Sequence, residues 1–415
     1  MSLIINLSRF SLKNLSFCIG KDLYKSFLMA LLSLLASMAI TSAAENDKKN
    51  FISGKIVTEL FDDYTYDSNK KYNEYNKTYL YSWLKFKTNL SKNLKLISNF
   101  RLREENNFSE QIRREETQDS SDSYFDNQSF FIHQLNLQYE YNNLKFVGGK
   151  FTSSFGRLWR SKDNIWLFDK ARREYKEDEK IGIASYLKIG DSTRNGEYIF
   201  GLASFINDSK FLNGSILTKR DGLDQTNATQ ASNKKGMKSY DLSLDINFDF
   251  TDKERLSYNF SYINLAVNDK NINNSDHKIK DQKGYSLSTE YLYPFSSNIV
   301  ANGFVEYIKY NNYFGKSDTD REFLTTKATI YFFDKYKIML GRYFDKIRET
   351  GVGRYDEEVR ELDFGYSFNG YKSYGYKYCD GFELMLGFKQ EIEDNRADKV
   401  ENNIAGFLLR YVKEF

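Results

Sequence analysis

Apolar and polar residues alternate along most of this chain. In "YDLSLDINFDF", every second residue from Tyr240 to Phe250 is apolar, and Asp, Ser or Asn stands between them. A β-strand points successive side chains to opposite faces, so this pattern predicts a strand with one apolar and one wet face. The same reading predicts sixteen strands, near 51–63, 78–90, 93–104, 128–141, 144–152, 179–189, 196–206, 236–250, 254–267, 282–294, 297–309, 321–333, 335–346, 358–368, 379–392 and 401–415.

The connections between these strands alternate in length. "SKN", "NN" and "TDKE" are short, whereas 105–127, 153–178, 207–235 and 268–281 are long and polar; "NGYKSYGYKYCDG" is a long segment where a short turn is expected. Short turns on one rim and long loops on the other are typical of transmembrane barrels. The fold class predicted is all-β, a transmembrane antiparallel β-barrel of sixteen strands. A soluble β-sandwich or β-solenoid is the alternative, but the apolar face is rich in Tyr and Phe, and no short repeat is present.

Composition supports a folded chain that does not bind nucleic acid. Among 415 residues there are 32 Tyr, 34 Phe and one Pro, and disordered chains are poor in aromatic residues. The 60 basic and 57 acidic residues leave a net charge of +3, which is too balanced for a general attraction to nucleic acid.

The first 44 residues differ from the rest. Lys13, Lys21 and Lys25 precede "SFLMALLSLLASMAITSAA", an apolar run that closes on small residues. This pattern predicts a signal peptide over 1–44, removed near Ala44, and a barrel domain over 45–415; a membrane anchor is the alternative. The mature chain would keep one cysteine, Cys379, which excludes an intramolecular disulfide and a cysteine zinc site. We expect no metal and no cofactor.

The chain ends "NNIAGFLLRYVKEF", with Phe415, Tyr411, Leu409 and Phe407 at steps of two. This ending resembles the C-terminal signature of Gram-negative outer-membrane barrels, although Lys413 stands where that family usually has an apolar residue. The resemblance implies an outer-membrane location, and it implies that Phe415 and Tyr411 are an assembly signal for the barrel assembly machinery. An ordinary edge strand is the alternative.

A second resemblance concerns "VGGKFTSSFGRLW". Gly149, Lys150, Phe151, Phe155 and Gly156 are similar to the third-loop entry of phosphate-selective and related porins, with Ser154 where those families commonly have Pro. The architecture over 51–415 also looks like a sixteen-stranded porin. This resemblance implies a water-filled channel for passive diffusion of small polar or ionic solutes, an inward-folded third loop, a homotrimer, and contacts with outer-membrane lipid and lipopolysaccharide.

The third loop, 153–178, is the candidate pore constriction. Residues 153–176 hold seven basic and three acidic groups, a net charge of about +4, which favours anions mildly in a narrow pore. A solvated surface loop is the alternative. The constriction residues predicted are Arg157, Arg160, Lys162, Lys170, Arg172, Arg173, Lys176, Asp163 and Asp169.

Charge on the predicted lumen wall is segregated. Early strands turn basic residues inward and later strands turn acidic ones inward, which predicts a transverse field; the alternative is that these charges merely keep the lumen wet. The wall residues predicted are Lys85, Lys87, Lys95, Arg101, Arg103, Asp241, Asp245, Asp249, Glu361, Asp363 and Glu383. Arg342 falls on the lipid face, where a charge is costly near the midplane, so it indicates a register error or a subunit contact.

An enzyme is not predicted. The two histidines are His133, on an apolar strand face, and His277, in a loop, and neither belongs to a catalytic constellation. Three function classes remain open: a diffusion porin, a substrate-specific channel for phosphate or other anions, and a loop-mediated adhesin or structural barrel.

Overall fold

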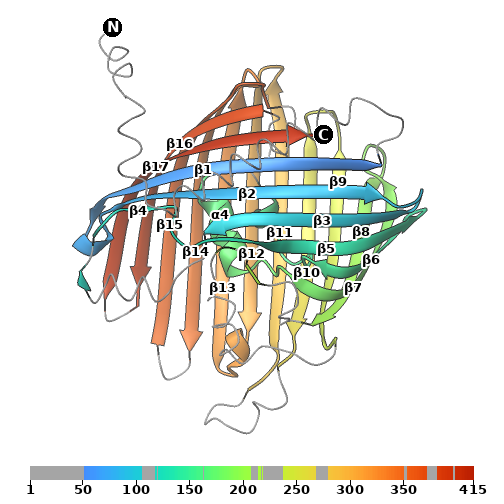
Figure 1. Ribbon diagram of the computed structural model, residues 1–415, viewed down its shortest axis with the longest axis horizontal. Helices are drawn as coiled ribbons and strands as arrows, with labels where there is room; N and C mark the ends of the chain where they lie inside the picture. The colour runs from blue at the N-terminus through green and yellow to red at the C-terminus, as the bar shows by residue number, and fades with distance from the viewer. Residues whose placement is uncertain are drawn as a thin grey trace.

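The computed structural model describes residues 51–104, 117–118, 120–161, 163–206, 214–215, 217, 237–267, 279–349, 353–371, 381–395 and 398–415. The predicted signal peptide over 1–44, Cys379 and His277 lie outside these residues. Long strands make up most of the described chain (Figure 1). They are β1 (Ile52–Ser68), β2 (Asn76–Asn89), β3 (Leu94–Glu104), β5 (Gln128–Tyr141), β6 (Leu144–Phe151), β7 (Lys180–Asp191), β8 (Gly196–Ile206), β9 (Ser239–Asp249), β10 (Arg255–Leu265), β11 (Gln282–Ser296), β12 (Ile299–Asn311), β13 (Thr319–Phe332), β14 (Tyr336–Glu349), β15 (Gly353–Ser367), β16 (Gly381–Asp394) and β17 (Lys399–Glu414).

These sixteen strands form one closed antiparallel barrel. Each strand pairs with the next long strand along the chain, and β1 pairs with both β2 and β17, which closes the ring. The short β4 (Ser123–Tyr124) adds a parallel pairing on β2. Every predicted strand overlaps one of the sixteen, so the predicted fold class is confirmed. Closure leaves no long unpaired edge.

Short helices interrupt the connections. They are η2 (Lys71–Asn73), η3 (Leu158–Arg160), α4 (Leu167–Glu174) and η4 (Tyr313–Gly315). Within the described ranges, no helix has the length and apolar character needed to cross a membrane.

The outward face of the barrel is apolar and the inward face is polar. On β11, β14 and β16 the outward residues Leu287, Leu340 and Leu386 are 48%, 59% and 54% exposed. On the opposite face of β11, Ser286 and Glu290 are buried. A surface of large exposed aliphatic and aromatic side chains around a polar interior is the arrangement that lipid contact requires.

One histidine does not lie where alternation places it. The pairing of β3 with β5 shifts between Asn99 and Phe100, which leaves His133 as an extra residue in β5. Such a bulge reverses the face on which the following residues lie. His133 is buried on the inward side, and its Nε2 lies 3.0 Å from Asp178. The prediction of an apolar-face position for His133 is therefore wrong.

The long connection between β15 and β16 returns into the barrel, as far as it is described. The backbone N–H of Tyr371 donates to Asp334, and its hydroxyl donates to Glu383 at 2.8 Å. The Tyr371 ring packs against Tyr331 with centroids 5.2 Å apart. The segment that departs from the expected short turn thus brings an aromatic residue onto the inner face at the short-turn end.

Candidate functional site

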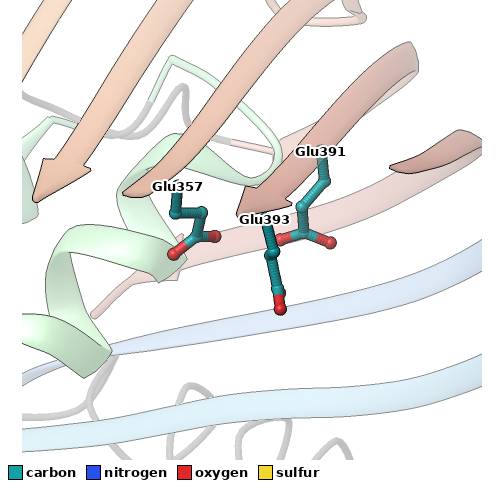
Figure 2. Close-up of side chains that lie close together, drawn as sticks. All are labelled: Glu357, Glu391 and Glu393. Carbon is teal, nitrogen blue, oxygen red and sulfur yellow. The ribbon is translucent and has the colours of Figure 1, made fainter. Parts of the chain in front are cut away.

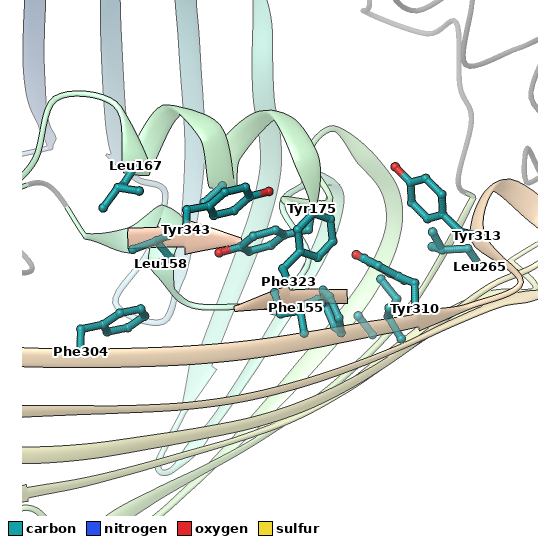
Figure 3. Packing of buried hydrophobic residues seen from close by; sticks show 14 of the residues in the cluster. Phe155, Leu158, Leu167, Tyr175, Leu265, Phe304, Tyr310, Tyr313, Phe323 and Tyr343 are labelled. Carbon is teal, nitrogen blue, oxygen red and sulfur yellow. The ribbon is translucent and has the colours of Figure 1, made fainter. Parts of the chain in front are cut away.

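The segment between β6 and β7, residues 152–179, crosses the inside of the barrel. Its apolar side chains join wall residues in a buried cluster that includes Phe155, Leu158, Leu167, Tyr175 and Phe323 (Figure 3). A second cluster sets Ile165, Trp166 and Phe168 against β1, β2, β16 and β17. Because the strands of the first cluster and those of the second cluster lie on different sides of the ring, the segment spans the interior.

Glycine allows the turn at the start of the segment. Gly156 has a φ of +72°, and a Cβ at this position would come within 2.9 Å of the Tyr175 ring. A side chain at this position would therefore be both strained and crowded. The "FG" pair of the sequence motif corresponds to this turn, in which Phe155 is buried and Gly156 lets the backbone pass close to Tyr175.

Glu306 of β12 holds the first half of the segment through its backbone. Its carboxylate accepts the N–H groups of Arg157 and Leu158, the latter at 3.1 Å, and also the hydroxyl of Tyr175. A buried carboxylate is stable when donors surround it. This contact satisfies backbone groups that the 3-10 turn leaves without partners.

Glu361 of β15 holds the second half at the start of α4. Its two oxygens accept the N–H groups of Ile165, Trp166 and Leu167 at 2.8, 2.9 and 2.7 Å. Asp363 accepts the Ile165 N–H as well, at 2.9 Å. The N-terminus of a helix attracts a negative charge because its first N–H groups are unpaired and its dipole is positive there. The barrel wall thus supplies the helix cap.

Asp163 lies between these two anchors and pairs with β13. Its carboxylate contacts the Lys327 ammonium and accepts hydrogen bonds from Thr329 at 2.9 Å and Tyr331 at 3.2 Å. Burial alone would raise the pKa of Asp163, but the ammonium groups of Lys327 and Lys337 hold it below its ordinary value. This predicted constriction residue is therefore an ionised anchor of the segment.

The six described basic residues of the third loop each lie close to a carboxylate, and Lys162 lies outside the described residues. The pairs are Arg157 with Asp245 (3.6 Å) and Glu290 (3.8 Å), Arg160 with Asp245 (3.4 Å), Lys170 with Glu357, Arg172 with Asp169, Arg173 with Asp169 (2.6 Å) and Lys176 with Asp178 (2.8 Å). Burial lowers the pKa of Lys176 to about 7. The charge of about +4 counted along the loop is thus largely balanced by carboxylates of the loop and the wall.

Residues of the predicted lumen wall lie on the inner face, but the segregation of charge is incomplete. Arg101 reaches Asp178 at 3.3 Å, and Arg103 stacks on the ring of Phe131. Lys337 and Arg410 stand on the side predicted to be acidic, where both contact Glu383, at 2.7 and 2.5 Å. Glu59 binds the same Arg410 at 2.7 Å. The sequence reasoning missed these cations and Glu306, although alternation within β12, β14 and β17 would have turned them inward.

Accessible basic residues lie on β2, on β6 and on the segment itself. Lys85 is exposed, Lys87 and Lys145 are half-buried, and Arg160 of the segment keeps 28% of its side chain exposed. The Lys145 ammonium lies 4.3 Å from the centroid of the Tyr186 ring. By contrast, Glu361, Glu383 and Arg410 on β15, β16 and β17 are 3% exposed or less. Beside the segment, β2 and β6 therefore keep a basic, solvent-accessible stretch of wall.

Three carboxylates converge near α4. Oxygens of Glu357, Glu391 and Glu393 all lie within 4.8 Å of one another (Figure 2). The Lys170 ammonium contacts Glu357, and Lys389 lies 3.6 Å from Glu391. Ammonium groups thus already supply positive charge to this cluster, and we assign no metal to it.

Comparison with known proteins shows the fold. No protein-family model matches the chain, and no curated protein sequence matches it. Among solved structures, the outer membrane channel DcaP of Acinetobacter baumannii matches with a TM-score of 0.52 and 12% identity, covering 87% of this chain and 96% of that one. OmpT, an outer membrane protein of Vibrio cholerae, gives 0.49 and 11%, with 88% and 99% covered, and OccAB3 of A. baumannii gives 0.47 and 10%, with 88% and 99% covered.

Proposed function

We propose that this protein is an outer-membrane porin, a water-filled channel through which small polar or ionic solutes diffuse passively, with a mild preference for anions. The observation that carries the proposal is the accessible inward wall of Lys85, Lys87 and Lys145 inside a closed barrel whose outer face is apolar. A barrel of sixteen strands is wide enough for an aqueous channel. Local cations inside a low-dielectric wall raise the concentration of anions.

The segment 152–179 is the proposed constriction. Its contacts with β1, β9, β12, β13 and β15 support this role because these strands lie on different sides of the barrel. Since its described cations are paired, the preference for anions would come mainly from the lysines of β2 and β6. A phosphate-selective channel would need a site whose hydrogen-bond donors are free to bind phosphate. The effect of phosphate on the conductance tests whether such a site is present.

Planar-bilayer recording of the purified, refolded protein tests the proposal. We expect discrete conductance steps, linear in voltage, and a reversal potential in a KCl gradient that indicates a mild excess of chloride permeability. Block by millimolar phosphate at constant ionic strength would instead support a substrate-specific channel. A correctly folded barrel that gives no conductance would refute the porin proposal and favour a structural or adhesive role.

The remaining proposals concern assembly. DcaP and OmpT share the fold, and a trimer form of OmpT is known, so we propose a homotrimer for this chain. We also propose that the chain is exported by a removable signal peptide and that Phe415 and Tyr411 are read by the barrel assembly machinery. Cross-linking in detergent that yields monomer alone would refute the trimer.

A further inference from the structure

A row of polar residues crosses the outer surface of β14 to β17 near its long-loop end. Arg342, Arg360, Gln390 and Asn403 are direct cross-strand neighbours in successive strand pairs. On the short-turn side of this row the outward residues are apolar and exposed, and they include Leu340, Phe364, Leu386 and Phe388. Beyond the row, Phe344 and Ile392 still face outward beside Glu358, so the row lies near the long-loop end of the apolar surface.

The two arginines share one carboxylate. Glu358 accepts a hydrogen bond from Nε of Arg342 at 2.7 Å and another from Nε of Arg360 at 2.6 Å. One negative charge between two positive charges leaves an excess of +1 at this point of the outer surface. The Arg342 guanidinium also lies 4.1 Å from the centroid of the Phe344 ring, which fixes its orientation.

The outer nitrogens of Arg342 are available to a ligand. Its contact with Glu358 uses Nε, and within the described residues its two terminal nitrogens have no recorded hydrogen bond, while its side chain is 48% exposed. Arg360, 51% exposed, directs Nη1 to Gln390 at 3.0 Å. A guanidinium held at Nε presents a planar pair of donors, a geometry that matches a phosphate.

We propose that Arg342 and Arg360 bind a phosphate group of an outer-leaflet glycolipid. The inference rests on the proposed outer-membrane location. A charge on the lipid face is costly near the midplane but not at the headgroup level, where an anionic group can neutralise it. Lys346 and Arg348 follow on the outward face of β14, at the same end as the long loops, beside the carboxylates Glu322, Asp320 and Asp356 of the neighbouring strands.

Native mass spectrometry of the folded protein in detergent tests this site, with diphosphoryl lipid A and a phosphate-free glycolipid of equal acyl number as probes. We expect R342Q/R360Q to bind diphosphoryl lipid A about tenfold more weakly than the wild type, because charge-assisted hydrogen bonds to phosphate are lost. The phosphate-free glycolipid should bind both proteins equally. The matched control is K283Q/K413Q, which removes two outward cations, on β11 and at the short-turn end of β17, away from the row.

Equal binding of diphosphoryl lipid A by the wild type and R342Q/R360Q would overturn the proposal, as would an equal loss in the control. A change in subunit number with unchanged lipid binding would also overturn it, because the row would then contact a second copy of the chain. A heat-dependent shift in gel mobility verifies folding of each variant. Conductance is recorded separately, so a barrel that binds lipid without conducting would refute the porin alone.

Discussion

Gly54 and Phe415 meet where the barrel closes. The N–H of Gly54 donates to the carbonyl of Phe415 at 2.7 Å, and the N–H of Phe415 donates back at 3.0 Å. A Cβ at Gly54 would collide with the Phe415 ring and would lie 2.9 Å from the Lys85 carbonyl. Glycine at this position thus lets the last aromatic ring lie flat across the first strand.

We expect Gly54→Val to weaken closure by about 1–3 kcal/mol, because the added atoms cannot be accommodated without moving Phe415 or the backbone. The fraction of protein that keeps the heat-dependent mobility shift after mild heating measures this loss. Gly303→Val is the matched control, since a Cβ at Gly303 meets nothing within 4 Å. Equal behaviour of the two variants would show that the contact has no role in closure.

Asp169 gives the segment a dependence on pH. Burial would raise its pKa, but the guanidinium groups of Arg172 and Arg173 lower it from 3.8 to about 2. Because the pKa of Asp169 is lower in the folded segment than in the unfolded chain, the charged carboxylate stabilises the fold at pH values above about 4. This stabilisation is lost as the pH falls from about 4 through 2.

We therefore expect Asp169→Asn to cost about 2 kcal/mol of local stability at pH 7. The difference from the wild type should shrink as the pH falls from about 4 to 2. The thermal transition of tryptophan fluorescence in a Trp83→Phe background, which reports Trp159 and Trp166 in the segment, measures both effects. A difference that stays constant down to pH 2 would mean that the arginines do not stabilise the charged form.

At the scale of elements, the strands could be predicted from the sequence and the crossing segment only in part. Alternation depends on neighbours two residues apart, so the sequence itself carries it. The bulge that turns His133 inward adds one residue to β5, and the local sequence does not mark its position. The partners of Arg160 and Leu167 are Asp245 and Glu361, 85 and 194 residues further along the chain. Local charge counting therefore could not show that the loop's charge is balanced.

The cap on α4 is the element-scale feature most open to test. We expect Glu361→Ala to loosen the segment while the barrel still folds, because the N–H groups of Trp166 and Leu167 lose their acceptor at about 1–3 kcal/mol for each donor left unpaired. Limited proteolysis of the folded protein should cut within 153–178 faster than in the wild type. Glu322→Ala, which removes an outward carboxylate paired with Lys309, is the control. Unchanged cleavage in Glu361→Ala would show that other contacts suffice to hold the helix.

At the scale of the whole molecule, the interior is uneven. Buried ion pairs surround Glu383 and hold the segment, whereas accessible lysines lie on β2 and β6. In this arrangement the wall lysines account for the proposed preference for anions, and the paired cations of the loop contribute little to it. It also separates the residues that hold the segment from those that would meet a solute.

We expect K85Q/K87Q/K145Q to lower the chloride-to-potassium permeability ratio roughly twofold at low salt, and the effect should fade at high salt because ions screen charges beyond about 10 Å near 0.1 M. The reversal potential in a KCl gradient measures it. K283Q/K309Q/K346Q removes three lysines from the outward face and should leave the ratio unchanged. An unaltered ratio in the first variant would show that solutes do not pass along β2 and β6.

The capture of backbone N–H groups by Glu306 and Glu361 has a consequence for how such a protein can diversify. A contact with the main chain is indifferent to which side chain the captured residue carries. Side chains elsewhere in the segment can therefore change while both attachment points persist. The barrel would then hold a segment whose accessible side chains can be exchanged. In a sensing nanopore, those side chains could be redesigned while Glu306 and Glu361 continue to bind the backbone of the segment.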